Sequence, residues 1–113
     1  MTTLRTTVYL NDSPGSFLGF DTERAILNMA ASFDLDIADH PTVPAAVQAA
    51  RETVFEQLNI DEPNHTWAQY YRLAGHRSLS VGDVVVIGET AWAVEDIGWR
   101  TVSAATLAAA RMR

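Results

Sequence analysis

The feature that most constrains the fold is the run Val84–Ile87, in which all four residues are β-branched. Branching at Cβ restricts the side-chain rotamers on a helix, so such residues fit a pleated, largely buried strand better. A short connection containing Gly88 follows, and Ala91–Val94 then resumes a strand pattern. The two runs therefore predict a β-hairpin in which Val84–Ile87 is a central strand.

The turn before this strand is rich in short polar side chains, namely those of Ser78, Ser80 and Asp83. Serine and aspartate in turns commonly bond nearby backbone amides, so we expect a structural role for them. The alternative is a polar ligand pocket formed by these three residues and Trp99. We assign no catalytic residue, because the closeness of His76 to Ser78 in sequence does not establish a serine–histidine pair and no nucleophile elbow is present.

Two further strands are predicted in the N-terminal third of the chain. Leu4–Leu10 is rich in strand-forming residues and is followed by a cluster of turn residues. In the second segment apolar residues occupy every other position, which predicts a half-buried strand with one apolar face. That face comprises Leu27, Met29, Ala31, Phe33, Leu35 and Ile37. A helix from Thr22 to Phe33 is the alternative, since alanine and methionine favour helices.

Helical spacing of apolar residues predicts an amphipathic helix over Pro44–Leu58, with Arg51 among the residues that face water. A shorter helix is predicted from Trp67 to Ala74, followed by another strand over 98–102 and an alanine-rich helix over 103–112. Residues 1–113 therefore form a single α+β domain. We expect a small antiparallel sheet of about four strands packed against two helices, with a short C-terminal helix.

Composition excludes several classes of function. With no cysteine there is neither a disulfide nor a thiolate nucleophile, and the net charge of −6 argues against nucleic-acid binding. The spacing of His40, His65 and His76 matches no metal motif. We therefore expect no metal and no cofactor. The chain lacks a membrane-spanning run and an apolar signal sequence, so we expect a cytoplasmic protein.

A cluster of aromatic and basic residues is the strongest candidate for a binding surface. Trp67, Tyr70 and Tyr71 follow helical i, i+3, i+4 spacing and therefore share one helix face. These types and arginine are enriched at the energetic centres of protein interfaces. The predicted partner-binding residues are Trp67, Tyr70, Tyr71, Arg72, His76 and Arg77. The alternative is that Trp67 and Tyr71 pack into the core.

The stretch from Val54 to Trp99 resembles the YodL-like domain family, small bacterial modules found in phages, plasmids and conjugative elements. The resemblance is carried by Val54–Ile60, by the run His76–Val85 with its Ser-Leu-Ser-Val-Gly-Asp-Val-Val core, by Trp92–Val94, and by Gly98-Trp99 where the family usually has Gly-Phe. The longer segment 61–75 resembles actinobacterial and actinophage members. The family has no established biochemical activity, so the resemblance implies a genomic setting rather than a mechanism.

Two functions follow as hypotheses. The first is a non-enzymatic interaction module of a phage or plasmid, which binds a host or element-encoded protein and possesses no catalytic activity. One version is an inhibitor of a host defence or regulatory protein. The second is a small nucleotide- or RNA-binding or enzymatic domain with its pocket at Ser78–Asp83. The sequence specifies neither the partner nor the strand order, and it leaves a homodimer open.

Overall fold

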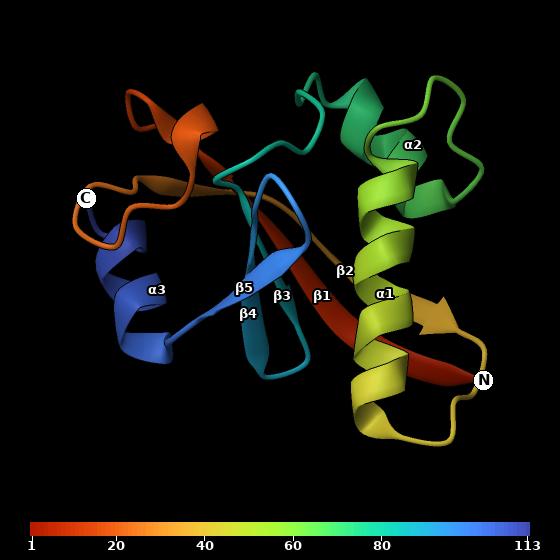
Figure 1. Cartoon of the computed structure of the whole chain (residues 1–113). Helices are drawn as coiled ribbons and strands as arrows, with labels where there is room; N and C mark the ends of the chain where they lie inside the picture. Colours follow the sequence, from red (N-terminus) through yellow and green to blue (C-terminus); the bar gives the residue numbers. More distant parts are fainter.

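A five-stranded antiparallel sheet, in the order β2-β1-β3-β4-β5, lies at the centre of the computed structural model, which describes residues 1–113 (Figure 1). Its strands are β1 (Thr2–Asn11), β2 (Leu27–Ile37), β3 (Val84–Ile87), β4 (Thr90–Val94) and β5 (Trp99–Val102). The predicted hairpin is confirmed as β3–β4, and β3 is a central strand between β1 and β4. The α+β class is also confirmed, with five strands rather than about four.

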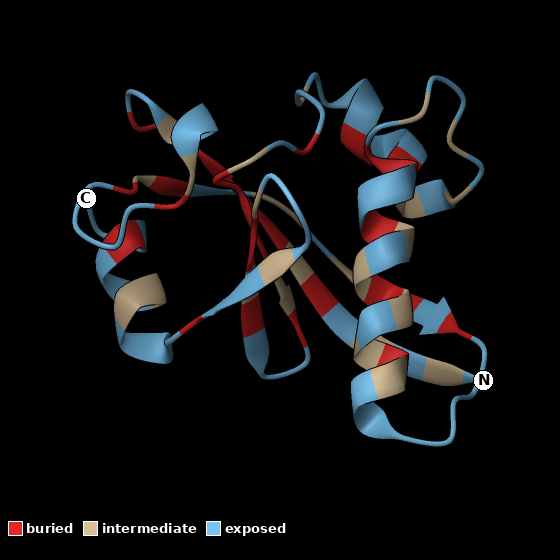
Figure 2. Ribbon diagram, viewed as in Figure 1, coloured by how far each residue is buried: buried red, intermediate tan, exposed pale blue.

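Helices cover both faces of this sheet. The helices α1 (Val43–Gln57) and α2 (Thr66–Leu73) lie on one face, and α3 (Ala104–Arg111) lies on the other (Figure 1). Each face has its own hydrophobic cluster, and the one under α1 and α2 is the larger. Buried positions follow the strands and the inner side of α1, as Figure 2 shows. None of the helices is long and apolar enough to cross a membrane.

The first and last helices begin with side-chain caps that satisfy otherwise unpaired backbone amides. The hydroxyl of Thr42 accepts a hydrogen bond from the Ala45 N–H at 3.2 Å. The hydroxyl of Ser103 accepts one from the Thr106 N–H at 3.1 Å. These caps explain why both helices start within one residue of the predicted positions.

The strand β2 contains a bulge that the sequence pattern does not reveal. The segment is a strand throughout, so the alternative helix over 22–33 is wrong. The prediction of one continuous apolar face is also wrong, because Val8 pairs with Ala31 whereas Tyr9 pairs with Met29, which leaves Ala30 as an extra residue. Beyond a one-residue bulge, each side chain points to the face of the sheet opposite to the one that strict alternation predicts.

The two ends of β2 therefore contribute to different cores. Leu35 and Ile37 pack beneath α1 and α2, whereas Leu27 packs in the cluster on the α3 side of the sheet.

The position of Arg51 on α1 differs from the prediction. Arg51 was expected to face water, yet it lies half-buried against the sheet. Its guanidinium carbon is 4.0 Å from the centre of the Trp92 ring on β4. Contact with a flat aromatic face explains how a charged side chain is accommodated there.

Candidate functional site

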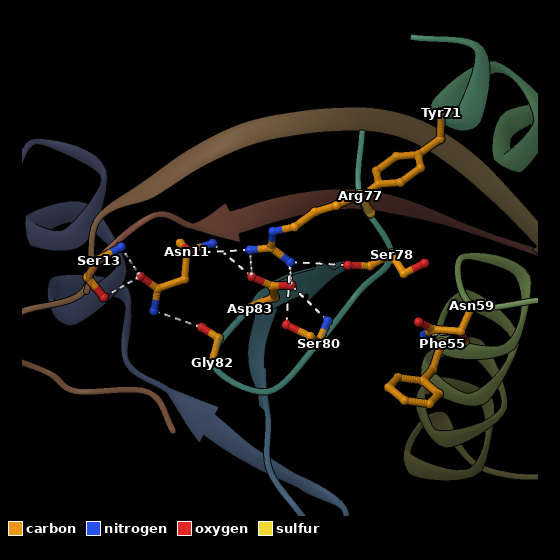
Figure 3. Close-up of polar contacts among 10 residues, drawn as sticks. All are labelled: Asn11, Ser13, Phe55, Asn59, Tyr71, Arg77, Ser78, Ser80, Gly82 and Asp83. Carbon is orange, nitrogen blue, oxygen red and sulfur yellow. Dashed lines mark hydrogen bonds and ion pairs between the residues drawn. The ribbon is translucent and has the colours of Figure 1, made fainter. Parts of the chain in front are cut away.

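The carboxylate of Asp83 is the buried centre of a polar network, and none of its surface is exposed. Arg77 donates two hydrogen bonds to it, from Nη1 to Oδ2 at 2.6 Å and from Nη2 to Oδ1 at 2.8 Å. The backbone N–H of Ser80 donates to Oδ2 and that of Asn11 donates to Oδ1, each at 2.8 Å (Figure 3). Four donors thus compensate the burial of one negative charge.

Asn11 connects this network to the turn that follows β1. Its side-chain amide donates to the carbonyl of Gly82 at 3.0 Å. Its side-chain oxygen accepts from the N–H and the hydroxyl of Ser13 at 3.1 and 2.7 Å. The carbonyl of Asn11 accepts from Arg77 Nη2 at 3.2 Å. The end of β1 and the turn before β3 are therefore fastened together (Figure 3).

Gly82 allows these two loops to approach each other. Its φ is +90°, a region that residues with a Cβ rarely adopt. A Cβ at this position would lie 2.3 Å from the carbonyl oxygen of Ser16. Glycine is therefore required by both the backbone conformation and the available space.

This geometry gives the Ser78–Asp83 turn a structural role. Asp83 already accepts four hydrogen bonds and is closed to solvent, so a ligand would have to break the network to reach it. The hydrogen bond to Asp83 raises the pKa of the Arg77 guanidinium above its ordinary value. Trp99 belongs to different surroundings, packing edge-on against Phe55 of α1 with ring centres 6.2 Å apart.

The predicted aromatic cluster lies mainly in a groove between α2 and β2. The groove, which we call the α2–β2 groove, has a volume of about 230 Å³. It is lined by Ala30, Ala31, Ser32, Phe33, Trp67, Tyr70, Tyr71, Ala74 and His76. Four of the six predicted partner-binding residues are therefore brought together, namely Trp67, Tyr70, Tyr71 and His76.

The aromatic residues of the groove differ in their accessibility. Tyr70 is 68% exposed, whereas Tyr71 is 4% exposed. Trp67 is half-buried and stacks on Phe33 of β2, with ring centres 4.2 Å apart and planes 6° from parallel. His76 packs against Tyr71 with ring centres 5.0 Å apart. Tyr70 is thus the most exposed of the aromatic side chains that line the groove.

The two arginines predicted as partner contacts make intramolecular bonds instead of lining the groove. Arg72 donates to the carbonyls of Ile60 and Asp61 at 2.5 and 2.9 Å, which fastens the loop between α1 and α2. Arg77 holds Asp83. Their side chains are partly exposed, but their guanidinium groups already have protein partners.

Sequence reasoning missed the contribution of β2 to this groove. The alternating pattern predicts a strand that contains Phe33, but nothing in the sequence shows that this strand ends the sheet beside α2. Strand order depends on pairing between distant segments, so composition and periodicity could not supply it. No group of three or more histidine or acidic side chains is placed to hold a metal ion.

The two roles of Gly82 can be separated by comparing it with Gly75. Gly75 has a similar φ of +86°, but a Cβ there would contact nothing within 4 Å. We expect Gly75→Ala to lose roughly 1–2 kcal/mol of unfolding free energy from the left-handed backbone alone. Gly82→Ala should lose clearly more, because the Ser16 carbonyl must also move. Equal losses in chemical denaturation would contradict the close approach of the two loops.

Tyr71 predicts a specific loss of stability at high pH. Its hydroxyl donates to the Arg77 carbonyl at 2.6 Å, and burial, followed by the charge of Asp83, raises its pKa to about 12. Below pH 10 the residue is protonated in both the folded and the unfolded state. Between about pH 10 and 12 only the unfolded chain loses this proton, so the free energy of unfolding should fall by on the order of 2 kcal/mol.

Denaturation curves over that pH range test whether the pKa of Tyr71 is raised in the folded protein, with Tyr71→Phe as the reference. The variant lacks the ionisable hydroxyl and should show a shallower decline than the wild type. Parallel declines would mean that Tyr71 ionises as readily in the folded protein as in the unfolded chain.

Comparison of the chain with family models, with curated proteins and with solved structures finds no match in any of the three. The resemblance to YodL-like domains therefore stays a prediction from the sequence.

Proposed function

We propose that this protein is a non-enzymatic interaction module that binds an extended segment of a partner protein in the α2–β2 groove. The partner is a protein of the bacterial host or of the element that encodes the module. In the version we favour, a phage or plasmid uses the module in the host cytoplasm to inhibit a defence or regulatory protein.

The observation that carries this proposal is the aromatic groove beside an open strand edge. β2 has 11 residues and ends the sheet, so only β1 pairs with it. None of the backbone hydrogen bonds outside the regular elements involves β2. An extended segment could therefore add to this edge through main-chain bonds while one of its side chains enters the groove.

The groove supplies the types of side chain that such binding requires. Tyrosine and tryptophan give large contact areas with little loss of side-chain entropy, and both are enriched at interface hot spots. Tyr70 stands open at the groove while the stacked pair Trp67–Phe33 forms a rigid wall. The net charge of −6 favours a segment that carries basic residues.

The genomic part of the proposal rests on the sequence resemblance of Val54–Trp99 alone. The alternative function, a nucleotide or RNA site at Ser78–Asp83, is less favoured because Asp83 is fully buried and already accepts four hydrogen bonds, two of them from Arg77. The acidic charge also opposes nucleic acid.

Affinity capture from host lysate with the wild type and two variants tests the proposal. Tyr70→Ala removes the open aromatic contact, and we expect it to weaken the captured complex roughly tenfold. Leu73→Ala is the matched control, because Leu73 lies on the same helix, is 82% exposed and does not line the groove. Arg72 is left intact because its loss would release the loop that it fastens.

The captured protein is then divided into synthetic peptides, and the binding peptide is mapped on the module by NMR. Shifts along β2 and α2 that Tyr70→Ala reduces and Leu73→Ala preserves would support the proposal. Binding that is equal in both variants, or that maps to another face, would overturn it.

A further inference from the structure

A second hollow lies between α1 and the β3–β4 hairpin, and it contains an arginine without an anionic partner. Arg51 lies over the Trp92 ring at 4.0 Å and is 5.9 Å from the centre of the Trp99 ring. The side chain makes none of the five ion pairs of the protein. Its Nε and the indole nitrogen of Trp92 are buried without a hydrogen-bond partner.

This arrangement is unusual for a partly buried charge. Buried ionic groups are ordinarily paired, because removing a charge from water is costly. Burial lowers the pKa of Arg51 from its ordinary value. The charge of the neighbouring Glu52 offsets this effect in part. Its carboxylate forms no ion pair with Arg51, however, and accepts a hydrogen bond from Gln48 at 3.3 Å. An external anion would therefore supply an interaction that the protein itself lacks.

The space beside Arg51 is suited to a small ligand. The hollow has a volume of about 370 Å³, which falls in the range of roughly 300–1,000 Å³ that is typical of small-molecule sites. Val43, Pro44 and Val47 form an apolar wall from the first turns of α1. Gln48 and Thr90 supply polar groups at the same hollow.

We propose that this hollow binds a small organic carboxylate, with the carboxylate on the terminal nitrogens of Arg51 and the apolar body of the ligand against the α1 wall. The planar fork of a guanidinium matches the two oxygens of a carboxylate. The tryptophan rings hold that fork in place before binding, which reduces the entropy lost on association. Arg51 is the only basic residue that lines the hollow, and the whole protein has a net charge of −6. This charge balance favours a ligand with one negative charge over a phosphate.

This inference goes beyond the proposed function, because the hollow shares no lining residue with the α2–β2 groove. The carboxylate could belong to a free organic acid or to the C-terminus of a peptide. Titrations with benzoate and with N-acetylphenylalanine distinguish these two sources, and sodium sulfate at matched ionic strength reports general anion binding.

The readout is the set of amide and indole N–H signals in two-dimensional NMR spectra. We expect saturable shifts at Gln48, Arg51 and Trp92 with at least one carboxylate. Arg51→Met keeps a flexible side chain on the tryptophan ring but removes the charge, and it should weaken binding roughly tenfold or more. Arg51→Lys, which keeps the charge without the planar fork, should bind with intermediate affinity.

Arg111→Met is the matched control. Arg111 also lies over an aromatic ring, that of Tyr9 at 5.1 Å, and it too makes no ion pair. The Arg111→Met variant removes the same unit of charge far from the hollow, so carboxylate binding should stay at the wild-type level. The carboxylate that binds more tightly identifies the source. The proposal is overturned if neither carboxylate gives saturable shifts, if sulfate gives the same shifts, or if both methionine variants weaken binding equally.

Discussion

The buried carboxylate of Asp83 is the interaction on which the rest of the structure depends. It binds the end of β1 through the Asn11 N–H, the loop after α2 through Arg77, and its own turn through the Ser80 N–H. Asn11 and Asp83 are separated by 72 positions in the chain. A fully buried charge is stable only when such partners are present, so these segments must assemble together for the sheet to form around it.

The same network positions the candidate binding surface. Arg77 binds Asp83 with its guanidinium, and its carbonyl accepts the hydroxyl of Tyr71 from α2. The helix that carries Tyr70 is therefore held to the sheet by a chain of hydrogen bonds that starts at Asp83. Residues of the Ser-Leu-Ser-Val-Gly-Asp turn therefore position the α2–β2 groove without lining it. By contrast, Arg51 is positioned by the tryptophans of β4 and β5 and has no intramolecular acceptor.

Local signals predicted most elements, and long-range geometry accounts for the errors. Three signals depend only on neighbouring residues: the β-branched run Val84–Ile87, the alternation in β2 and the alanine-rich run near the C-terminus. The corresponding elements are confirmed. The bulge at Ala30 has no compositional signature, because alanine fits either face. Helical spacing grouped Trp67, Tyr70 and Tyr71 correctly on α2, but the burial of Arg51 and the open edge of β2 depend on which strands and helices meet.

A double-mutant cycle at Arg77 and Asp83, measured by chemical denaturation, tests the central role of the ion pair most directly. The account predicts that Asp83→Asn loses about 3 kcal/mol or more, because a buried arginine bond and two backbone donors lose their charged acceptor. Arg77→Gln should also lose about 3 kcal/mol or more, because it leaves the fully buried carboxylate of Asp83 without its charged partner. The double variant should lose less than the sum of the single losses. A loss below about 0.5 kcal/mol for Asp83→Asn, with additive effects in the double variant, would contradict the account.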